Sequence, residues 1–287
     1  MDLMFAGAKG IACKPIGKIK GGQDGAIYAD VLFRFDAAGN ARAFEADGTV
    51  TLFRLGDLDR IVPHANAVFF GTDFWEAGDE FPLLYINIYN NYSSKEDRKE
   101  GTCCAYRLRR TEDSFSAALV QVIKVGFVAQ PEWRSEHVQD VRPYGNFVAE
   151  PSTGSLYAFV MRDEDKKTRF FRFAMPKATD GTYDTELGCN VVTLGLADCM
   201  GWFDTPWMCG MQGAACHDGY IYSSEGFSDS DEYPPVLRVI DLKNREEVMK
   251  IHLGELIPNV EPEFVEVYQG KVYYSDAEGD IYQVSFL

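Results

Sequence analysis

The stretch Glu263-Phe-Val-Glu-Val-Tyr-Gln-Gly-Lys-Val-Tyr-Tyr-Ser-Asp276 aligns without a gap with Gln212-Gly-Ala-Ala-Cys-His-Asp-Gly-Tyr-Ile-Tyr-Ser-Ser-Glu225. Each stretch consists of a short apolar run, a turn that contains glycine, and an aromatic-rich run that ends on an acidic residue. Looser copies begin near Gln23, Asn66 and Asn146. A unit that recurs at about 40–50 residues, with four strand patterns per unit, is typical of a β-propeller. The repeat therefore predicts an all-β propeller, in which chemistry is expected at the central channel.

The number of units predicts the number of blades. The 287 residues contain five units, so we expect one domain, 1–287, with five blades of four antiparallel strands. The third unit takes its outer strand from Asn190–Leu194, and Leu196–Gly210 crosses to the fourth unit. The fifth unit lacks one strand, which we expect Gly10–Lys20 to supply, because closure by an N-terminal strand leaves no exposed sheet edge. Six blades is the alternative if Leu196–Gly210 contains further strands.

Composition and charge narrow the possible functions. Hydrophobic residues make up 46% of the chain, enough for a large core. The net charge of −16 argues against nucleic acids and anionic membranes as partners, and is compatible with a divalent cation or a cationic ligand. The seven cysteines show no disulfide or zinc pattern, and Cys103 and Cys104 should point to opposite faces of one strand. With no signal-peptide pattern and no apolar run of membrane-spanning length, we expect a cytoplasmic protein.

One polar residue stands at the head of the innermost strand of each unit. Because innermost strands line the channel, we expect these side chains to converge on the axis. They could satisfy backbone groups and water around a narrow channel, or they could bind a small-molecule ligand or a hard cation. A carboxylate with amide oxygens suits Ca²⁺ or Mg²⁺, and the predicted metal ligands are Asn66, Asn146 and Glu263. The full predicted ring consists of Gln23 or Asp24, Asn66, Asn146, Gln212 and Glu263.

A resemblance to a known family rests on two motifs near the C-terminus. Glu261-Pro-Glu-Phe264, followed by Gly270-Lys-Val-Tyr-Tyr-Ser-Asp276, resembles the corresponding motifs of the gluconolactonase and senescence-marker family. Members of that family are six-bladed, Ca²⁺-dependent lactonases, and a Glu, two Asn and an Asp in the channel hold the metal. The resemblance implies a lactonase-like hydrolase, in which the cation polarises a carbonyl group and activates water. It assigns Glu263 to the Glu, Asn66 and Asn146 to the Asn pair, and only Asp24 to the Asp.

Two further residues lie shortly before predicted strand heads. His64 precedes Asn66 by two positions, so on a strand both would face the same side, where His64 could act as a general base. A loop histidine without a catalytic role is the alternative. Arg142 precedes Asn146 by four positions and could bind a carboxylate or phosphate of a ligand. It could equally pair with Glu261 or Glu263.

Two other classes of function remain open. A five-bladed glycoside hydrolase would need two carboxylates about 5–10 Å apart, which only Glu263 with Asp24 or Glu261 could supply. Most of the strand heads carry amides, and an amide can neither donate a proton as an acid nor act as a nucleophile. A non-catalytic scaffold that binds a ligand or a protein partner is the other alternative, since one fold hosts many functions. The candidates for catalysis are His64, Glu263 and Asp24.

Overall fold

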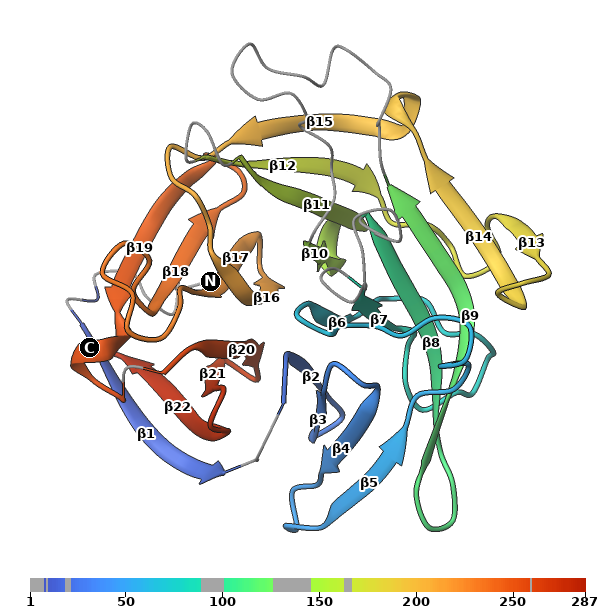
Figure 1. The fold of residues 1–287 in the computed structure, drawn as a ribbon, viewed down its shortest axis with the longest axis horizontal. Coiled ribbons are helices and arrows are strands. Elements are labelled where there is room, and N and C mark those ends of the chain that lie inside the picture. The colour runs from blue at the N-terminus through green and yellow to red at the C-terminus, as the bar shows by residue number, and fades with distance from the viewer. Residues whose placement is uncertain are drawn as a thin grey trace.

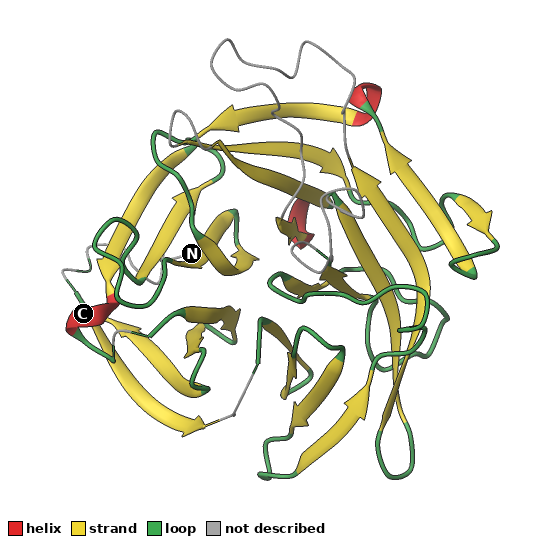
Figure 2. Cartoon of the chain, viewed as in Figure 1, coloured by secondary structure: helices red, strands yellow, loops and turns green. Residues whose placement is uncertain are grey.

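The chain folds into five β-sheets that surround a central axis (Figure 1). The computed structural model describes residues 8, 10–18, 22–88, 101–125, 146–162, 167–258 and 260–287. In this part of the chain almost all regular structure is strand (Figure 2), and none of the helical segments could cross a bilayer. The predicted all-β, five-bladed propeller is confirmed. The helical segments are the 3-10 turns η2 (Pro151–Thr153), η3 (Leu196–Asp198) and η4 (Leu253–Glu255).

Each blade starts at the axis, and its innermost strand comes from the N-terminal end of its unit. Blade 1 contains β2 (Gly25–Tyr28), β3 (Val31–Phe35), β4 (Asn40–Phe44) and β5 (Val50–Arg54). Blade 2 contains β6 (Val68–Phe70), β7 (Leu84–Asn87), β8 (Thr102–Arg110), β9 (Phe115–Val125), β14 (Cys189–Leu194) and β13 (Thr182–Asp184). Blade 3 contains β10 (Asn146–Glu150), β11 (Ser155–Arg162), β12 (Lys167–Ala174) and β15 (Cys199–Asp204). Blade 4 contains β16 (Met211–His217), β17 (Tyr220–Glu225), β18 (Val236–Asp241) and β19 (Glu246–His252), and blade 5 contains β20 (Pro262–Tyr268), β21 (Lys271–Asp276), β22 (Asp280–Phe286) and β1 (Ile11–Lys18).

The N-terminal strand closes the ring, as predicted for Gly10–Lys20. Strand β1 pairs antiparallel with β22, from Ile11 opposite Phe286 to Lys18 opposite Asp280. Figure 1 shows the blue N-terminal strand beside the red C-terminal strands. The Ile11 side chain is buried and joins the apolar cluster between blades 4 and 5. The first and last segments of the chain are therefore parts of one sheet.

The predicted outer strand of the third blade is wrong. Strand β14, at the predicted position, pairs in parallel with β9 and so extends blade 2. Strand β15, inside the segment predicted to be a crossover, pairs with β12 and completes blade 3. In β14, Cys189 and Leu194 are buried in apolar clusters that include blade 2, whereas Met200 and Trp202 of β15 are exposed, as at an outer edge. The segment 196–210 thus contains a strand but no sixth blade.

Apolar side chains fill the interfaces between successive blades from blade 1 to blade 5. Cys104 lies in the cluster between blades 1 and 2, and Cys103 lies in the cluster between blades 2 and 3, which confirms that they point to opposite faces. Among the described residues no comparable cluster joins blade 5 to blade 1. This interface instead contains charged and polar side chains, including the cation of Arg34 over the ring of Phe264.

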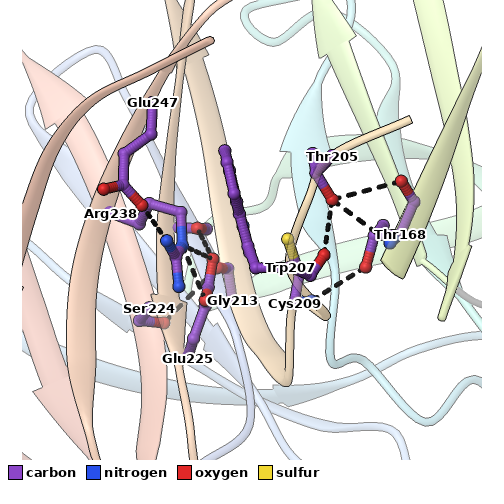
Figure 3. Close-up of polar contacts among 10 residues, drawn as sticks. Thr168, Thr205, Trp207, Cys209, Gly213, Ser224, Glu225, Arg238 and Glu247 are labelled. Carbon is purple, nitrogen blue, oxygen red and sulfur yellow. Dashed lines mark hydrogen bonds and ion pairs between the residues drawn. The ribbon is translucent and has the colours of Figure 1, made fainter. Parts of the chain in front are cut away.

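The crossover from blade 3 to blade 4 brings the chain to the head of β16. The Thr205 hydroxyl donates a hydrogen bond to the Trp207 carbonyl oxygen at 2.6 Å. The Cys209 backbone N–H donates to the Thr168 hydroxyl at 2.8 Å. Figure 3 shows these contacts beside the Trp207 ring. Since Thr168 belongs to β12, these bonds fix the crossover to blade 3 immediately before the innermost strand of blade 4.

A buried ion pair in blade 4 meets the same crossover (Figure 3). The Arg238 guanidinium donates to both carboxylate oxygens of Glu225 at 3.0 Å and also contacts Glu247. Arg238 lies 4.6 Å from the centroid of the Trp207 ring, a cation–π distance. Glu225 and Arg238 are both buried, and burial raises the Glu225 pKa while Arg238 opposes that rise. This cluster joins blade 4 to the crossover and accounts for the buried acid at the end of β17.

Candidate functional site

Irregularities in strand pairing place two of the predicted side chains. The pairing of β16 with β17 shifts between Met211 and Gly213, and the pairing of β20 with β21 shifts between Pro262 and Phe264. Gln212 and Glu263 are therefore the extra residues of β-bulges, which redirect a side chain relative to a regular strand. Both bulges occur at the same position of the repeated unit. The gapless match in the sequence thus corresponds to a shared backbone feature.

Three asparagines form a hydrogen-bonded group at the inner edges of blades 2 and 3, called here the amide cluster. The Asn87 Nδ2 atom donates to Asn66 Oδ1 at 2.8 Å and to Asn146 Oδ1 at 2.6 Å. The Asn146 Nδ2 atom donates to the Met211 carbonyl oxygen at 3.2 Å. All three asparagines are buried. The amide cluster therefore links the inner strands of blades 2, 3 and 4.

A second group occupies the interface of blades 5 and 1 and is called here the head cluster. Its members are Gln23, Asp24, Arg34, Glu263 and Asp276. The Gln23 Nε2 atom donates to Glu263 Oε1 at 3.2 Å, and the backbone N–H of Val68 donates to Asp24 Oδ2 at 2.8 Å. Electrostatic interaction couples Arg34 to the carboxyl groups of Asp24, Glu263 and Asp276. The head cluster thus brings together acids from both ends of the chain around one guanidinium group.

Glycine residues make room for the head cluster. A Cβ atom at Gly25, which pairs with Arg34, would lie 2.2 Å from the Phe33 carbonyl oxygen and 2.8 Å from Arg34 Cδ. A Cβ atom at Gly213 would lie 3.0 Å from Asp24 Oδ1. The Arg34 Nη2 atom donates to the Gly22 carbonyl oxygen at 3.3 Å. The backbone at the heads of β2 and β16 therefore packs directly against the charged groups.

Several charged atoms of the head cluster lack partners. Asp24, Arg34, Glu263 and Asp276 are each at most 6% exposed. Within the described residues no hydrogen-bond partner is present for five of their atoms: Asp24 Oδ1, Arg34 Nε, Arg34 Nη1, Glu263 Oε2 and Asp276 Oδ2. A buried polar atom without a partner costs about 1–3 kcal/mol, so native proteins rarely leave several together. Each of these five atoms could take part in a further hydrogen bond.

Burial shifts the proton equilibria of this cluster. Burial, with a smaller contribution from the Glu261 charge, raises the pKa of Glu263 to about 8, while Arg34 and Gln23 oppose the rise. Burial also raises the pKa of Asp24 well above its ordinary value. Burial lowers the pKa of Arg34 to about 10, so the guanidinium remains charged at neutral pH. Near pH 7 the cluster therefore presents the Arg34 cation and the mainly protonated carboxyl group of Glu263, both of which can donate hydrogen bonds.

We expect Glu263→Gln to remove a pH dependence of stability. A carboxyl group with a raised folded-state pKa stabilises the fold below its ordinary pKa of 4.5, and this contribution is lost as pH rises through about 8. Gln keeps the shape of the side chain and cannot ionise. Between pH 4.5 and about 8, the free energy of unfolding of the variant should therefore fall by about 2–4 kcal/mol less than that of the parent. Urea denaturation from pH 5 to pH 9 measures this. Glu246→Gln, at an exposed position of β19, should keep the parental slope; an unchanged slope in Glu263→Gln would contradict the assignment.

The remaining predicted residues lie as follows. The Gln212 Nε2 atom donates to Glu261 Oε1 at 2.5 Å, so Gln212 joins blade 4 to blade 5. The backbone N–H of His64 donates to the Asn87 carbonyl oxygen, and burial lowers the His64 pKa, which leaves the imidazole neutral at pH 7. Arg142 lies outside the described residues.

The sequence interpretation missed Arg34, Asn87 and Asp276. Arg34 is the only charged residue in the run Val31–Phe35, and Asn87 stands between two isoleucines, so each breaks an apolar pattern. Asp276 ends the repeated stretch at the position equivalent to Glu225, and both acids are buried. A polar residue within an otherwise buried strand was the available signal for all three.

The residues predicted to hold a divalent cation are Asn66, Asn146 and Glu263. Both amide oxygens accept hydrogen bonds from Asn87, so they are directed toward an N–H donor. Within the described residues, no three His, Cys, Asp or Glu side chains are grouped so that they could hold a metal ion. The described arrangement does not fit a cation bound by this set. Ca²⁺ or Mg²⁺ remains a prediction for titration.

A cavity of about 410 Å³, called here the tail cavity, lies at the C-terminal ends of the innermost strands, away from the head cluster. All five innermost strands contribute to its wall, so it lies on the propeller axis. Glu266 is its acidic group, and Tyr28, Phe69, Phe70 and Phe74 supply aromatic surface. Burial is the main cause of the raised Asp24 pKa, and the Glu266 charge adds to it.

Comparisons with known proteins support the fold. No protein-family model and no curated protein sequence matches the chain. Among solved structures, the chain is similar to the glutaminyl cyclase of Myxococcus xanthus, with 12% identity over 96% of each chain and a TM-score of 0.51. It is also similar to the virginiamycin B lyase of Staphylococcus aureus, with 9% identity over 96% of this chain and 100% of that chain and a TM-score of 0.47. At these identities the similarity concerns the fold alone.

Proposed function

We propose that the protein binds a small, oxygen-rich organic molecule, such as a sugar acid or a lactone, at the head cluster. The observation that supports this most is the buried Arg34 guanidinium, whose Nε and Nη1 atoms have no partner among the described residues. A planar guanidinium with two free N–H groups suits a carboxylate or a carbonyl oxygen. The acids of the cluster add further donors in their protonated forms. A ligand rich in acceptor oxygens would complete these hydrogen bonds.

Binding is supported better than hydrolysis. A glycoside hydrolase needs one ionised and one protonated carboxyl group at its working pH, whereas the pKa values of Asp24 and Glu263 are both raised. A lactonase-like reaction needs a general base or a metal-activated water, and neutral His64 is the available base by its pKa. A metal-dependent hydrolase is therefore the second function that the screen described below can detect, and a non-catalytic scaffold is the third.

A thermal-shift screen tests the proposal. The panel contains D-glucose, D-gluconate, D-glucono-δ-lactone and simple γ-lactones, each with EDTA, Ca²⁺ or Mg²⁺. A ligand at 100 times its Kd adds about 2.7 kcal/mol to stability, which corresponds to a rise in Tm of roughly 5–10 °C for a chain of this size. We expect such a rise with at least one acid or lactone in the presence of EDTA. A rise that requires Ca²⁺, together with acid release from a lactone, would favour the hydrolase, and no rise with any compound would favour the scaffold.

A further inference from the structure

We propose that the tail cavity is a second binding site, specific for an organic cation, with Glu266 as the anionic partner of an ammonium group. The cavity holds about 410 Å³, enough for a small ligand. It lies at the far ends of the innermost strands from Glu263, and it does not depend on the function proposed for the head cluster. Its wall combines one carboxyl group with aromatic rings, and this combination selects positive charge.

The charge of the cavity comes from Glu266. The backbone N–H groups of Val267 and Ile27 donate to its two oxygens at 2.8 and 3.4 Å, which fixes the carboxyl group at the wall. Among the described residues that line the cavity none is lysine or arginine, and His217 is the only basic side chain of that set. An ammonium ion would therefore meet an acid without competition from a resident Lys or Arg side chain. The net charge of −16 for the whole chain favours the approach of a cation.

The aromatic side chains supply the second part of the recognition. Tyr28 extends from β2, Phe69 and Phe70 from β6, and Phe74 from the following loop. Phe74 is 43% exposed, although it is a large apolar side chain at the cavity. A cation over an aromatic face is attracted by the electron-rich ring, and the attraction is stronger where the site excludes water. A substituted ammonium ion can contact both the rings and the carboxylate, whereas an uncharged ligand of the same shape uses the rings alone.

Proton release should accompany binding. Burial raises the Glu266 pKa to about 7, so the group is about half protonated at neutral pH. Other titratable groups line the cavity, namely Tyr28 from β2 and Cys216 and His217 from β16, and the Glu266 charge also influences Asp24. Burial raises the pKa values of Asp24 and the Cys216 thiol well above their ordinary values, which favours their neutral forms. Glu266 is therefore the acid that a bound cation would ionise, and affinity should rise about tenfold from pH 6 to pH 8.

Calorimetric titration with choline and its neutral isostere, 3,3-dimethylbutan-1-ol, tests the inference. We expect choline to bind at least tenfold more tightly than the alcohol at pH 8. The choline affinity should rise about tenfold from pH 6 to pH 8, with a heat that depends on the buffer, while the alcohol should show no such trend. Equal affinity for the two compounds, or no binding of choline up to about 10 mM, would overturn the proposal.

Variants separate the cavity from other acidic sites. Glu266→Gln keeps the shape and should lower the choline affinity at pH 8 at least tenfold, without changing the affinity for the alcohol. Phe74→Ala removes an exposed ring and should weaken choline binding several-fold, which gives a second test if Glu266→Gln fails to fold. Glu246→Gln, an exposed acid on an outer strand, is the matched control and should bind choline as the parent does. Parental choline binding by a folded Glu266→Gln protein would overturn the assignment.

Discussion

Deletion of residues 1–20 should unfold the propeller or cause it to aggregate. The deletion removes β1, exposes the edge of β22 along its whole pairing, and withdraws Ile11 from the core between blades 4 and 5. Burial of one isoleucine contributes about 1.5–3 kcal/mol, and each lost ladder hydrogen bond adds about 0.5–1.5 kcal/mol. The combined loss of unfolding free energy should exceed about 5 kcal/mol. Because each kcal/mol shifts Tm by about 2–4 °C, the Tm should fall by at least about 10 °C.

Thermal melts with size-exclusion chromatography measure this effect. Deletion of residues 1–7 is the matched control, because it leaves in place both β1 and Ala8, which packs against the cluster between blades 4 and 5. The control should melt close to the parent. A protein lacking residues 1–20 that remains monomeric and as stable as the parent would contradict closure of blade 5 by β1.

Arg238→Met should have the largest effect of any single substitution considered. It removes the cation that faces the buried carboxylate of Glu225 and the ring of Trp207. Removing one partner of a buried ion pair costs about 3–5 kcal/mol, because the other charge is left without compensation. The double variant Arg238→Met with Glu225→Gln should recover part of that loss, since no buried charge remains.

Denaturant unfolding of these variants at pH 7 provides the test. Arg109→Met is the control, because Arg109 and its closest ion-pair partner, Glu76, are each more than half exposed, and such pairs contribute at most about 1 kcal/mol. A loss below about 1 kcal/mol in Arg238→Met would mean that the buried pair does not support the junction of blades 3 and 4.

The repeated stretch carried enough information to predict the fold. Gln212 and Glu263 occupy the same bulge in two blades. The match between the two stretches predicted the propeller and identified the heads of its innermost strands. The third blade was harder, because the segments at 189–194 and 199–204 both have strand patterns. The choice between them depends on packing against β9 or β12, residues far away in the sequence. Local sequence preference does not contain that information.

The candidate site was predicted only in part. The strand heads were identified, but their partners come from second strands: Asn87 from β7, Arg34 from β3 and Asp276 from β21. Whether a polar residue on a second strand faces the axis depends on pairing register and on closure of the ring, which a single sequence does not specify. For this reason the sequence predicted a cation site at Asn66 and Asn146, where the structure has side-chain amides hydrogen-bonded to Asn87. Arg34, which no sequence pattern had singled out, supplies a guanidinium beside Glu263.

Titration of the best ligand from the screen against Arg34 variants tests the central claim most directly. Arg34→Lys keeps the charge and loses the planar pair of N–H groups, and Arg34→Met loses both. If the ligand binds at the head cluster, calorimetry should show at least about a tenfold loss of affinity in Arg34→Lys and a larger loss in Arg34→Met, since a hydrogen bond to a charged group contributes about 1.5–3 kcal/mol. Glu246→Gln should bind as the parent does. Folded Arg34 variants that bind the ligand with parental affinity would contradict the proposed site.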